Sequence, residues 1–446
     1  MRLISLFFSA VILVNNLRAQ TEQTFTLKQA QDYALTHNYQ RLNAEKDVLI
    51  AKKKVWETTG IGLPRIDAEA QFQNFLELPV SLIPATAFDP NAPADKFTEL
   101  KFGTDYNTTA KITATQLLFD GSYIVGLQVF KTYKNFVEKS LEKTALMVRE
   151  DVAQAYYLGL IADENEKILQ EIVVSTDQLL EETKKIYQEG FVEEQNVDQL
   201  QLTLNNINNS LTEAKRQKEI SLNLLKFQMG MELVTTISLT DNMETLLLGV
   251  NPEDVLSKEF KAENHIENQI IKVNEDLTKL NLRNEKFSFA PKIAAFFSHQ
   301  QQNMSNKFEV FNGGIWYPST LWGISIKVPI VSGGMRLAKM GQARLEYEKA
   351  KNTSKQVEQS LMLQVQRAKS DYTSSYSIYI NQKDGLKIAE KINNNSMKKY
   401  TEGMISSMEL NQTQTQYLET EARYIKSLLD LFNSTSQLNK ALGIIK

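Results

Sequence analysis

The residues best suited to catalysis or metal binding are few and scattered in this chain of 446 residues. The three histidines, His37, His265 and His299, lie far apart, and none forms a His-x-x-x-His or His-Glu pair of the kind that holds zinc. Cysteine is absent, so thiolate metal sites, disulfides and a lipidated N-terminal cysteine are excluded. The sequence also has no phosphate-binding loop, dinucleotide fingerprint or Gly-x-Ser-x-Gly elbow. It therefore predicts a protein that is not an enzyme and carries no metal or cofactor.

Three other segments have residue types that bind ligands or partners. Ser332-Gly333-Gly334 is glycine-rich, but a strand-to-helix turn explains it better than a phosphate cradle. The lysine run at 52–54 is interpreted as a solvated helix face. Met404 and Met408 offer either an adaptable docking surface or core packing. None of the three segments predicts catalysis.

The composition favours long, regular elements. Hydrophobic residues make up 42% of the chain and charged residues 23%, close to soluble domains, which excludes a bundle of membrane helices. Only 18 glycines and 9 prolines interrupt the chain, so long helices are expected. The 53 acidic and 50 basic residues nearly cancel, and nucleic acid is not an expected partner.

The N-terminus is typical of a secretory signal. Arg2 precedes an apolar stretch over residues 3–14, and a small residue, Ala19, stands where a signal peptidase would cut. At about 12 residues the stretch is short for a membrane span, so an anchor or a buried helix is the weaker interpretation. We predict a signal peptide over residues 1–19 and a mildly acidic mature protein.

The chain contains two copies of one unit. Residues 185–190 align with 398–403 at an offset of 213, which also places Gly230 on Gly443. Upstream, Pro64 falls on Pro291 at an offset of 227, so the connection between the aligned segments is longer in one copy. We predict a first repeat over residues 20–245 and a second over 246–446.

Each repeat contains a very long helix followed by a helix that runs back. From Leu141 to Tyr187 the seam positions alternate steps of four and three, the period of a coiled coil. Between Gly121 and Gly190 only isolated glycines interrupt the pattern, which predicts a rod of roughly 100 Å at ~1.5 Å per residue. A returning seam starts after each glycine, so hairpin tips are expected near residues 190 and 403.

The segments before each long helix alternate with period two. Strands are predicted at about 63–77, 104–119, 290–302 and 320–331. Each has one apolar and one polar face over about 10 residues, as the wall of a water-filled membrane barrel requires. Taken singly, each strand is equally typical of a sheet on a soluble core. The signal peptide and the lack of any other anchor favour the membrane interpretation.

Four strands cannot close a barrel alone, because single-chain barrels start at about eight. Three chains supply twelve strands, an even number, and each chain then covers the edge of its neighbour. The predicted fold class is mainly α with a membrane β part: a trimeric 12-stranded β-barrel, with four strands per chain, on a long α-helical coiled-coil barrel. The proline-containing connection at about 78–103 is interpreted as the external loop of the first strand pair.

This pattern resembles the TolC-like outer membrane efflux protein family over essentially the whole mature chain. The resemblance rests on short segments in a fixed order: Thr26-Leu27-Lys28-Gln29-Ala30 with Ala34-Leu35 and Asn38, Leu63-Pro64-Arg65-Ile66, Leu118-Phe119-Asp120-Gly121, and the two tips. It implies a trimeric duct in the outer membrane of a Gram-negative bacterium, with a large periplasmic part. It also implies export of small molecules or proteins through docking to a periplasmic adaptor (membrane fusion) protein and an inner-membrane RND or ABC transporter.

The resemblance also implies roles for residues at the tips. Gly190 and Gly403, supported by Tyr187 and Tyr400, take the position of the adaptor-docking turns. The acidic residue that the family has six positions past the tip glycine is Glu409 in the second copy. The remaining candidates for the tunnel constriction are Asn196, Asp198 and Gln412, and Asn196 and Gln412 depart from the acidic pattern. Glu409 and Asp198 are alternatively residues of a solvated helix face.

Two other classes of protein compete with the duct. A secreted or periplasmic trimeric coiled-coil structural protein or adhesin explains the heptads, but not the paired amphipathic strands at matched places in both repeats. An enzyme on a helical scaffold lacks a recognisable site.

Overall fold

The computed structural model describes residues 23–243, 246, 256–309 and 313–444. The predicted signal peptide at 1–19 lies outside the described residues, and at the predicted junction of the repeats only residue 246 is described. The chain forms two compact units. We call residues 50–135 and 273–351 the sheet unit, and residues 1–49, 136–272 and 352–446 the helical unit. Each unit takes segments from both predicted repeats.

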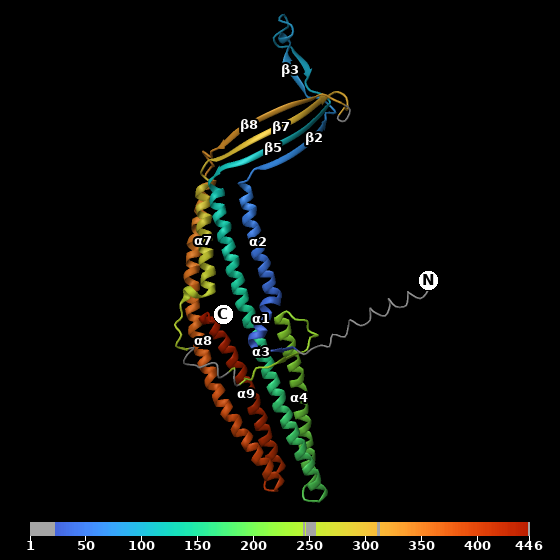
Figure 1. The fold of residues 1–446 in the computed structure, drawn as a ribbon, viewed down its shortest axis with the longest axis vertical. Helices are drawn as coiled ribbons and strands as arrows, with labels where there is room; N and C mark the ends of the chain where they lie inside the picture. Colours follow the sequence, from blue (N-terminus) through green and yellow to red (C-terminus); the bar gives the residue numbers. More distant parts are fainter. Residues whose placement is uncertain (1–22, 244–245, 247–255, 310–312, 445–446) are drawn as a thin grey trace, which may run out of the picture. The chain divides into compact units, whose positions relative to one another are not determined.

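The sheet unit contains a four-stranded antiparallel sheet (Figure 1). Its strands, in the order β2-β5-β7-β8, are β2 (Arg65–Asn74), β5 (Tyr106–Asp120), β7 (Lys292–Ser305) and β8 (Trp316–Lys327). The last strand ends earlier than the predicted 331, because Pro329 has no N–H to donate to a ladder. A register shift between Leu117 and Phe119 interrupts the pairing of β5 with β7.

Specific residues convert strand to helix at each long helix. Helix α3 (Gly121–Gln188) begins where the Asp120 carboxylate accepts hydrogen bonds from the Ser122 and Tyr123 N–H groups, at 2.9 and 3.2 Å. Helix α8 (Met335–Thr401) follows Gly333 and Gly334, which have φ of +57° and +80°. The glycine-rich segment is therefore a turn that needs left-handed backbone. Helices α2 (Tyr39–Ile61) and α7 (Ile266–Phe287) precede β2 and β7.

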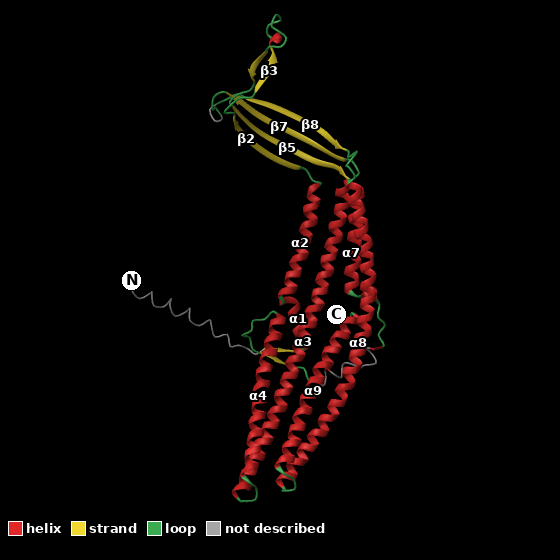
Figure 2. Cartoon of the chain, turned by 180° about the vertical axis from the view of Figure 1, so that it is seen from behind, coloured by secondary structure: helices red, strands yellow, loops and turns green. Residues whose placement is uncertain are grey.

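The helical unit contains two helical hairpins of nearly equal length (Figure 2). Helix α3 has 68 residues and is followed by α4 (Glu194–Met229) of 36 residues; α8 has 67 and is followed by α9 (Ser407–Leu442) of 36. Apolar side chains from the two hairpins share their cores, as in the cluster that combines Leu180, Leu200, Tyr400 and Leu410. Burying a continuous apolar seam is what holds such long helices together.

The start of the described chain packs onto the first hairpin. Strand β1 (Gln23–Phe25) pairs in parallel with β6 (Ile237–Leu239), and Thr26 caps helix α1 (Leu27–His37) in a reciprocal capping box with Gln29. The Tyr156 hydroxyl donates to the Phe25 carbonyl or the Asp241 carboxylate, both at 2.9 Å. The first family-like segment of the sequence thus has a structural explanation in capping and packing.

Asn38 and His265 take matching places in the two repeats. Asn38 accepts hydrogen bonds from the N–H groups of residues 40 and 41 and donates to the Gln228 carbonyl at 2.8 Å. His265 accepts from the Glu267 N–H at 3.3 Å, and its other ring nitrogen lies 3.2 Å from the Lys440 carbonyl. The two residues are 227 positions apart, the offset that relates Pro64 to Pro291. His265 is therefore a helix-capping residue.

The long connection between β2 and β5 is more ordered than its sequence indicates. The connection predicted as an external loop at 78–103 contains a two-stranded hairpin, β3 (Val80–Pro84) and β4 (Phe97–Lys101), with the short 3-10 helix η1 (Ala85–Ala87) between them. Its prolines lie at or beyond strand ends, where the missing N–H interrupts no ladder bond. A second short 3-10 helix, η2, covers Ala262–Asn264.

The next two observations concern helices that could span a membrane and clusters that could bind a metal. Within the described ranges, none of the helices is both long and apolar enough to cross a lipid bilayer. In the same part of the chain, no three histidine, aspartate or glutamate side chains gather as a metal site would require.

Candidate functional site

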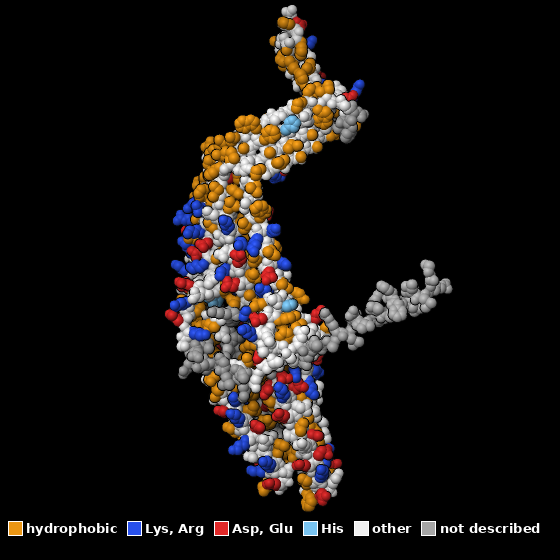
Figure 3. Space-filling model, in the orientation of Figure 1, with side chains coloured by type: hydrophobic (Ala, Val, Ile, Leu, Met, Phe, Trp, Pro, Cys, Tyr) orange, Lys and Arg blue, Asp and Glu red, His pale blue; other side chains and the backbone are white. Residues whose placement is uncertain are grey.

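The pairing register gathers apolar side chains on one face of the four-stranded sheet. Ile66 lies opposite Ala114, Ala114 opposite Phe297, and Phe297 opposite Trp322, so one row across all four strands is apolar. Trp322 is 77% exposed and Ile66 72%. Hydrophobic side chains cover much of the sheet in Figure 3. The same face continues through neighbouring rows: Ala68, Ala70, Phe72, Ala110, Ile112, Ala295, Ile324 and Ile326.

The other face of the sheet is mostly polar, although Phe296 and Leu321 also lie on it. The row formed by Glu69, Lys111, Gln300 and Ser319 is polar on all four strands. Since side chains alternate strictly between faces, this row cannot share the apolar side. A sheet with one exposed apolar face and one polar face is suited to a boundary at which the apolar face contacts lipid and the polar face contacts water.

The outer strands β2 and β8 have open edges. Among the described residues each pairs on one side only, β2 with β5 and β8 with β7. An edge strand presents a row of unpaired backbone N–H and C=O groups. Each backbone N–H or C=O group that has no hydrogen-bond partner in lipid costs on the order of several kcal/mol of free energy.

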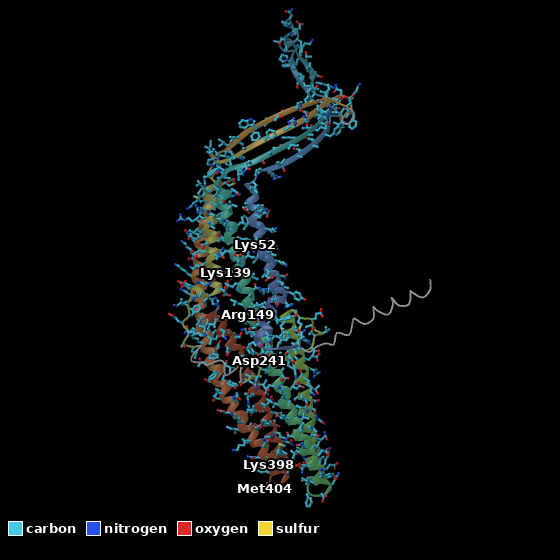
Figure 4. All side chains as sticks on the ribbon, viewed as in Figure 1. Lys52, Lys139, Arg149, Asp241, Lys398 and Met404 are labelled. Carbon is cyan, nitrogen blue, oxygen red and sulfur yellow. The ribbon has the colours of Figure 1, made fainter. Side chains whose placement is uncertain are left out.

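The two hairpin tips adopt the same turn. Gly190 and Gly403 have φ of +83° and +71°, and each donates its N–H to the tyrosine carbonyl three residues earlier, at 2.9 Å. The residue after each glycine, Phe191 or Met404, donates its N–H to the carbonyl five residues earlier. This is the bond pattern of a glycine-terminated helix. Met404 lies at the end of its hairpin in Figure 4.

Each tip presents a large apolar residue directly after its glycine, and Met408, which is 73% exposed, adds a second at the tip of the α8–α9 hairpin. Phe191 is 80% exposed and Met404 68%. They are 213 positions apart, so the offset could have identified Phe191, which the sequence analysis missed. An exposed aromatic or methionine at a tip is suited to docking against another protein.

The two tip tyrosines do not have equal surroundings. Tyr400 is buried in the apolar cluster between the hairpins, whereas Tyr187 is 40% exposed. Burial raises the pKa of the Tyr400 hydroxyl. Tyr400 therefore joins the two hairpins within one chain, and Tyr187 is left available to another partner.

The predicted constriction residues separate into one partly buried contact and three exposed side chains. The Ser407 hydroxyl donates to the side-chain Oδ1 of Asn196 at 2.6 Å, which links the first turns of α4 and α9. Asp198, Glu409 and Gln412 are exposed. The structure thus gives Asn196 a role in hairpin packing that its sequence position did not suggest.

A buried carboxyl in α9 was also missed. Glu421 is only 4% exposed, and its Oε1 has no hydrogen-bond partner in the part of the chain that is described. Burial raises the pKa of this carboxyl to about 7. The neighbouring Tyr417 has its pKa raised to about 12 by burial and by the negative charges of Glu390, Glu421 and Glu171. The centre of the hairpin pair therefore holds a proton-sensitive group.

Solved structures with this fold are outer-membrane channels. The chain has a TM-score of 0.70 to the CmeC outer membrane channel of Campylobacter jejuni, at 17% identity, over 94% of this chain and 85% of CmeC. The TM-score is 0.68 to the outer membrane protein VceC of Vibrio cholerae, at 14% identity, over 94% and 96% of the two chains. CusC, described as forming a transmembrane channel, gives 0.71 at 15% identity over 93% and 91%. No match is found among curated proteins.

The family model of outer membrane efflux proteins matches residues 274–444. The match covers most of the second predicted repeat, and over this part the chain is similar to outer membrane efflux proteins. The predicted family resemblance and the mainly helical fold with four strands per chain are confirmed.

The solved structures that the chain resembles are described as outer membrane channels or outer membrane proteins. The family comprises homotrimeric channels that dock with an adaptor and an inner-membrane pump.

Proposed function

We propose that three copies of this chain form the outer-membrane exit duct of a tripartite efflux or type I secretion system. The duct conducts small molecules or proteins passively, and the energy for transport comes from the inner-membrane RND or ABC transporter. The observation that carries the proposal is the four-stranded sheet with one apolar and one polar face and two open edges.

Closure of the sheet requires other copies of the chain. An apolar face exposed to lipid is favourable, but open edges in lipid are not. If β8 of one copy pairs with β2 of the next, three copies give a closed barrel of twelve strands, and the polar rows around Lys111 line its interior. A soluble coiled-coil stalk, the alternative, would not explain why this sheet exposes an apolar face.

The tips are proposed as the adaptor-docking surface. Gly190 and Gly403 fix two equal turns, and Phe191 and Met404 present apolar side chains beyond them. Tyr187 supports the first turn from an exposed position, and Tyr400 supports the second from the core between the hairpins.

The narrowest part of the tunnel is proposed to lie near the start of α4 and α9. Asp198, Glu409 and Gln412 are exposed there, and threefold symmetry would arrange each of them as a ring. A ring of three Glu409 carboxylates would attract cations. Asn196 holds the two helix starts together through Ser407 and sets the position of the ring.

The proposal includes maturation and domain organisation. Residues 1–19 act as a cleaved signal peptide, and 20–245 and 246–446 are two tandem repeats of one efflux unit. The matching caps Asn38 and His265 and the matching glycines Gly230 and Gly443 support the duplication.

Cell fractionation with a heat-modifiability gel tests the proposal. The protein is expected in the outer-membrane fraction, as an assembly that migrates differently before and after boiling. Deleting the protein should sensitise cells to toxic compounds or abolish a secreted product. Recovery in the soluble fraction, with the same migration before and after boiling, would contradict the duct and favour the stalk.

A further inference from the structure

A two-stranded hairpin occupies the connection between β2 and β5, at the end of the sheet where β2 ends and β5 begins (Figure 1). Within the described residues, β3 and β4 pair only with each other, over five residue pairs. An isolated two-stranded hairpin is marginally stable in water unless one of its faces packs against something else. The sheet unit of a single chain offers no third strand to it.

The hairpin has apolar side chains on both faces. On one face Val80, Leu82 and Phe97 are exposed, Leu82 at 63% and Phe97 at 55%. The opposite face carries Ile83 and Leu100, which are partly buried. Hydrophobic side chains dominate this end of the unit in Figure 3. Exposed apolar area on this scale indicates a surface that is covered in the assembled protein.

The base of the hairpin is fixed to the end of the sheet. The Phe75 N–H donates to the Asp105 carbonyl at 2.8 Å, which closes the base. Below it Phe72, Tyr106 and Phe308 form an aromatic cluster with ring centroids 5.7 to 6.2 Å apart. The connection that carries the hairpin is therefore tied to the end of the sheet at its base.

The hairpin leaves the sheet from β2, which is an edge strand. In the proposed trimer this edge is the seam at which the next copy pairs. A second copy is therefore the nearest large surface, and the contact would continue the strand-to-strand interface. Its charges are compatible with such contact, since Glu99 and Lys101 stand on the exposed apolar face and carry opposite signs.

We infer that the β3–β4 hairpin is an intersubunit clasp, which packs Val80, Leu82 and Phe97 against the neighbouring copy at the outer end of the barrel. The inference rests on the proposed trimeric barrel. The hairpin would then stabilise the contact between subunits at the outer end of the barrel. This role explains why the connection carries apolar residues, although a polar external loop could also join the two strands.

The absence of cysteine makes a direct labelling test possible. Leu82→Cys and Phe97→Cys each introduce one thiol into the proposed contact, and Asn91→Cys introduces one into the exposed connection between the strands as a control. Maleimide labelling is measured on the purified detergent-solubilised assembly and on the same protein dissociated in SDS. We expect thiols at 82 and 97 to react about tenfold or more slowly than the thiol at 91 in the assembly, and equally fast after dissociation.

The outcomes separate this inference from the proposed function. A trimer in which positions 82 and 97 react as fast as position 91 overturns the clasp and leaves the duct intact. A monomer overturns both. Protection in intact outer membranes but not in the purified trimer also overturns the clasp, because another surface component would then be the occupant.

A second pair of variants measures the strength of the contact. Leu82→Asp should lower the temperature at which the trimer dissociates in SDS, whereas Ser81→Asp, on the opposite face of the same strand, should change it much less. Equal effects of the two substitutions would refute a contact specific to the apolar face.

Discussion

Replacing Glu421 by glutamine should remove a pH dependence of stability that the wild type carries. The pKa of this carboxyl is raised from its ordinary 4.5 to about 7 by burial. Protonation therefore favours the folded state: the stabilisation is complete below about pH 4.5 and is lost as the pH rises through about 7. The displacement of the pKa corresponds to about 3 kcal/mol per chain above pH 8. Glutamine keeps the size of the side chain and cannot ionise.

The assay is thermal unfolding in detergent, followed by the helical circular dichroism signal between pH 5 and 8.5. Wild type should lose stability across this range relative to Glu421→Gln, and the variant should be the more stable protein at pH 8.5. Glu419→Gln is the matched control, since Glu419 is exposed on the same helix and should leave the pH profile unchanged. Superimposable profiles for wild type and Glu421→Gln would refute the reasoning, because the buried carboxyl would then not be the titrating group.

Three further substitutions, with Gly385→Ala as a control, test the hairpins. Glu409→Gln should lower cation preference or raise conductance in planar bilayers, and unchanged values in both would remove Glu409 from the constriction. Gly403→Ala should cost about 1 kcal/mol because of its φ of +71° and should weaken adaptor co-purification. Gly385→Ala, within helix α8, should be neutral or stabilising, and a loss as large as that of Gly403→Ala would contradict the turn argument. Asn196→Ala should lower the stability in thermal melts by about 1–3 kcal/mol, because the buried Ser407 hydroxyl loses its acceptor; an unchanged melt would show that this bond does not join the hairpins.

The sequence predicted the architecture because its signals are periodic and local. Alternation around Ile66 and the stepped seam from Leu141 are visible in one segment at a time, without knowledge of what packs against it. The register that aligns Ile66, Ala114, Phe297 and Trp322 in one row depends on a pairing between Ala114 and Phe297, which are 183 residues apart, and only the structure provides it.

Glu421 was missed although its position carried a signal. It lies four residues after Tyr417 and three before Tyr424, both on the returning seam, so the heptad places it in the core. The other residues in that register are buried as well: Gln414, Leu428 and Thr435. Glutamate is rarely buried, so its residue type predicts an exposed side chain, whereas its heptad position predicts a buried one. The structure agrees with the heptad position.

The β3–β4 hairpin was missed for the opposite reason. Prolines at 79, 84, 90 and 93 are typical of a loop, and strands of five residues are too short to show a period. Pairing between Val80 and Lys101 is a contact across 21 residues that composition does not reveal.

The central claim is that each chain supplies four strands to a barrel that only three copies can close. The most direct test is the mass of the purified full-length protein by native mass spectrometry from detergent. The account predicts a mass of three chains, with separation into single chains only after heating in SDS. A single chain that stays soluble and folded without detergent would contradict it.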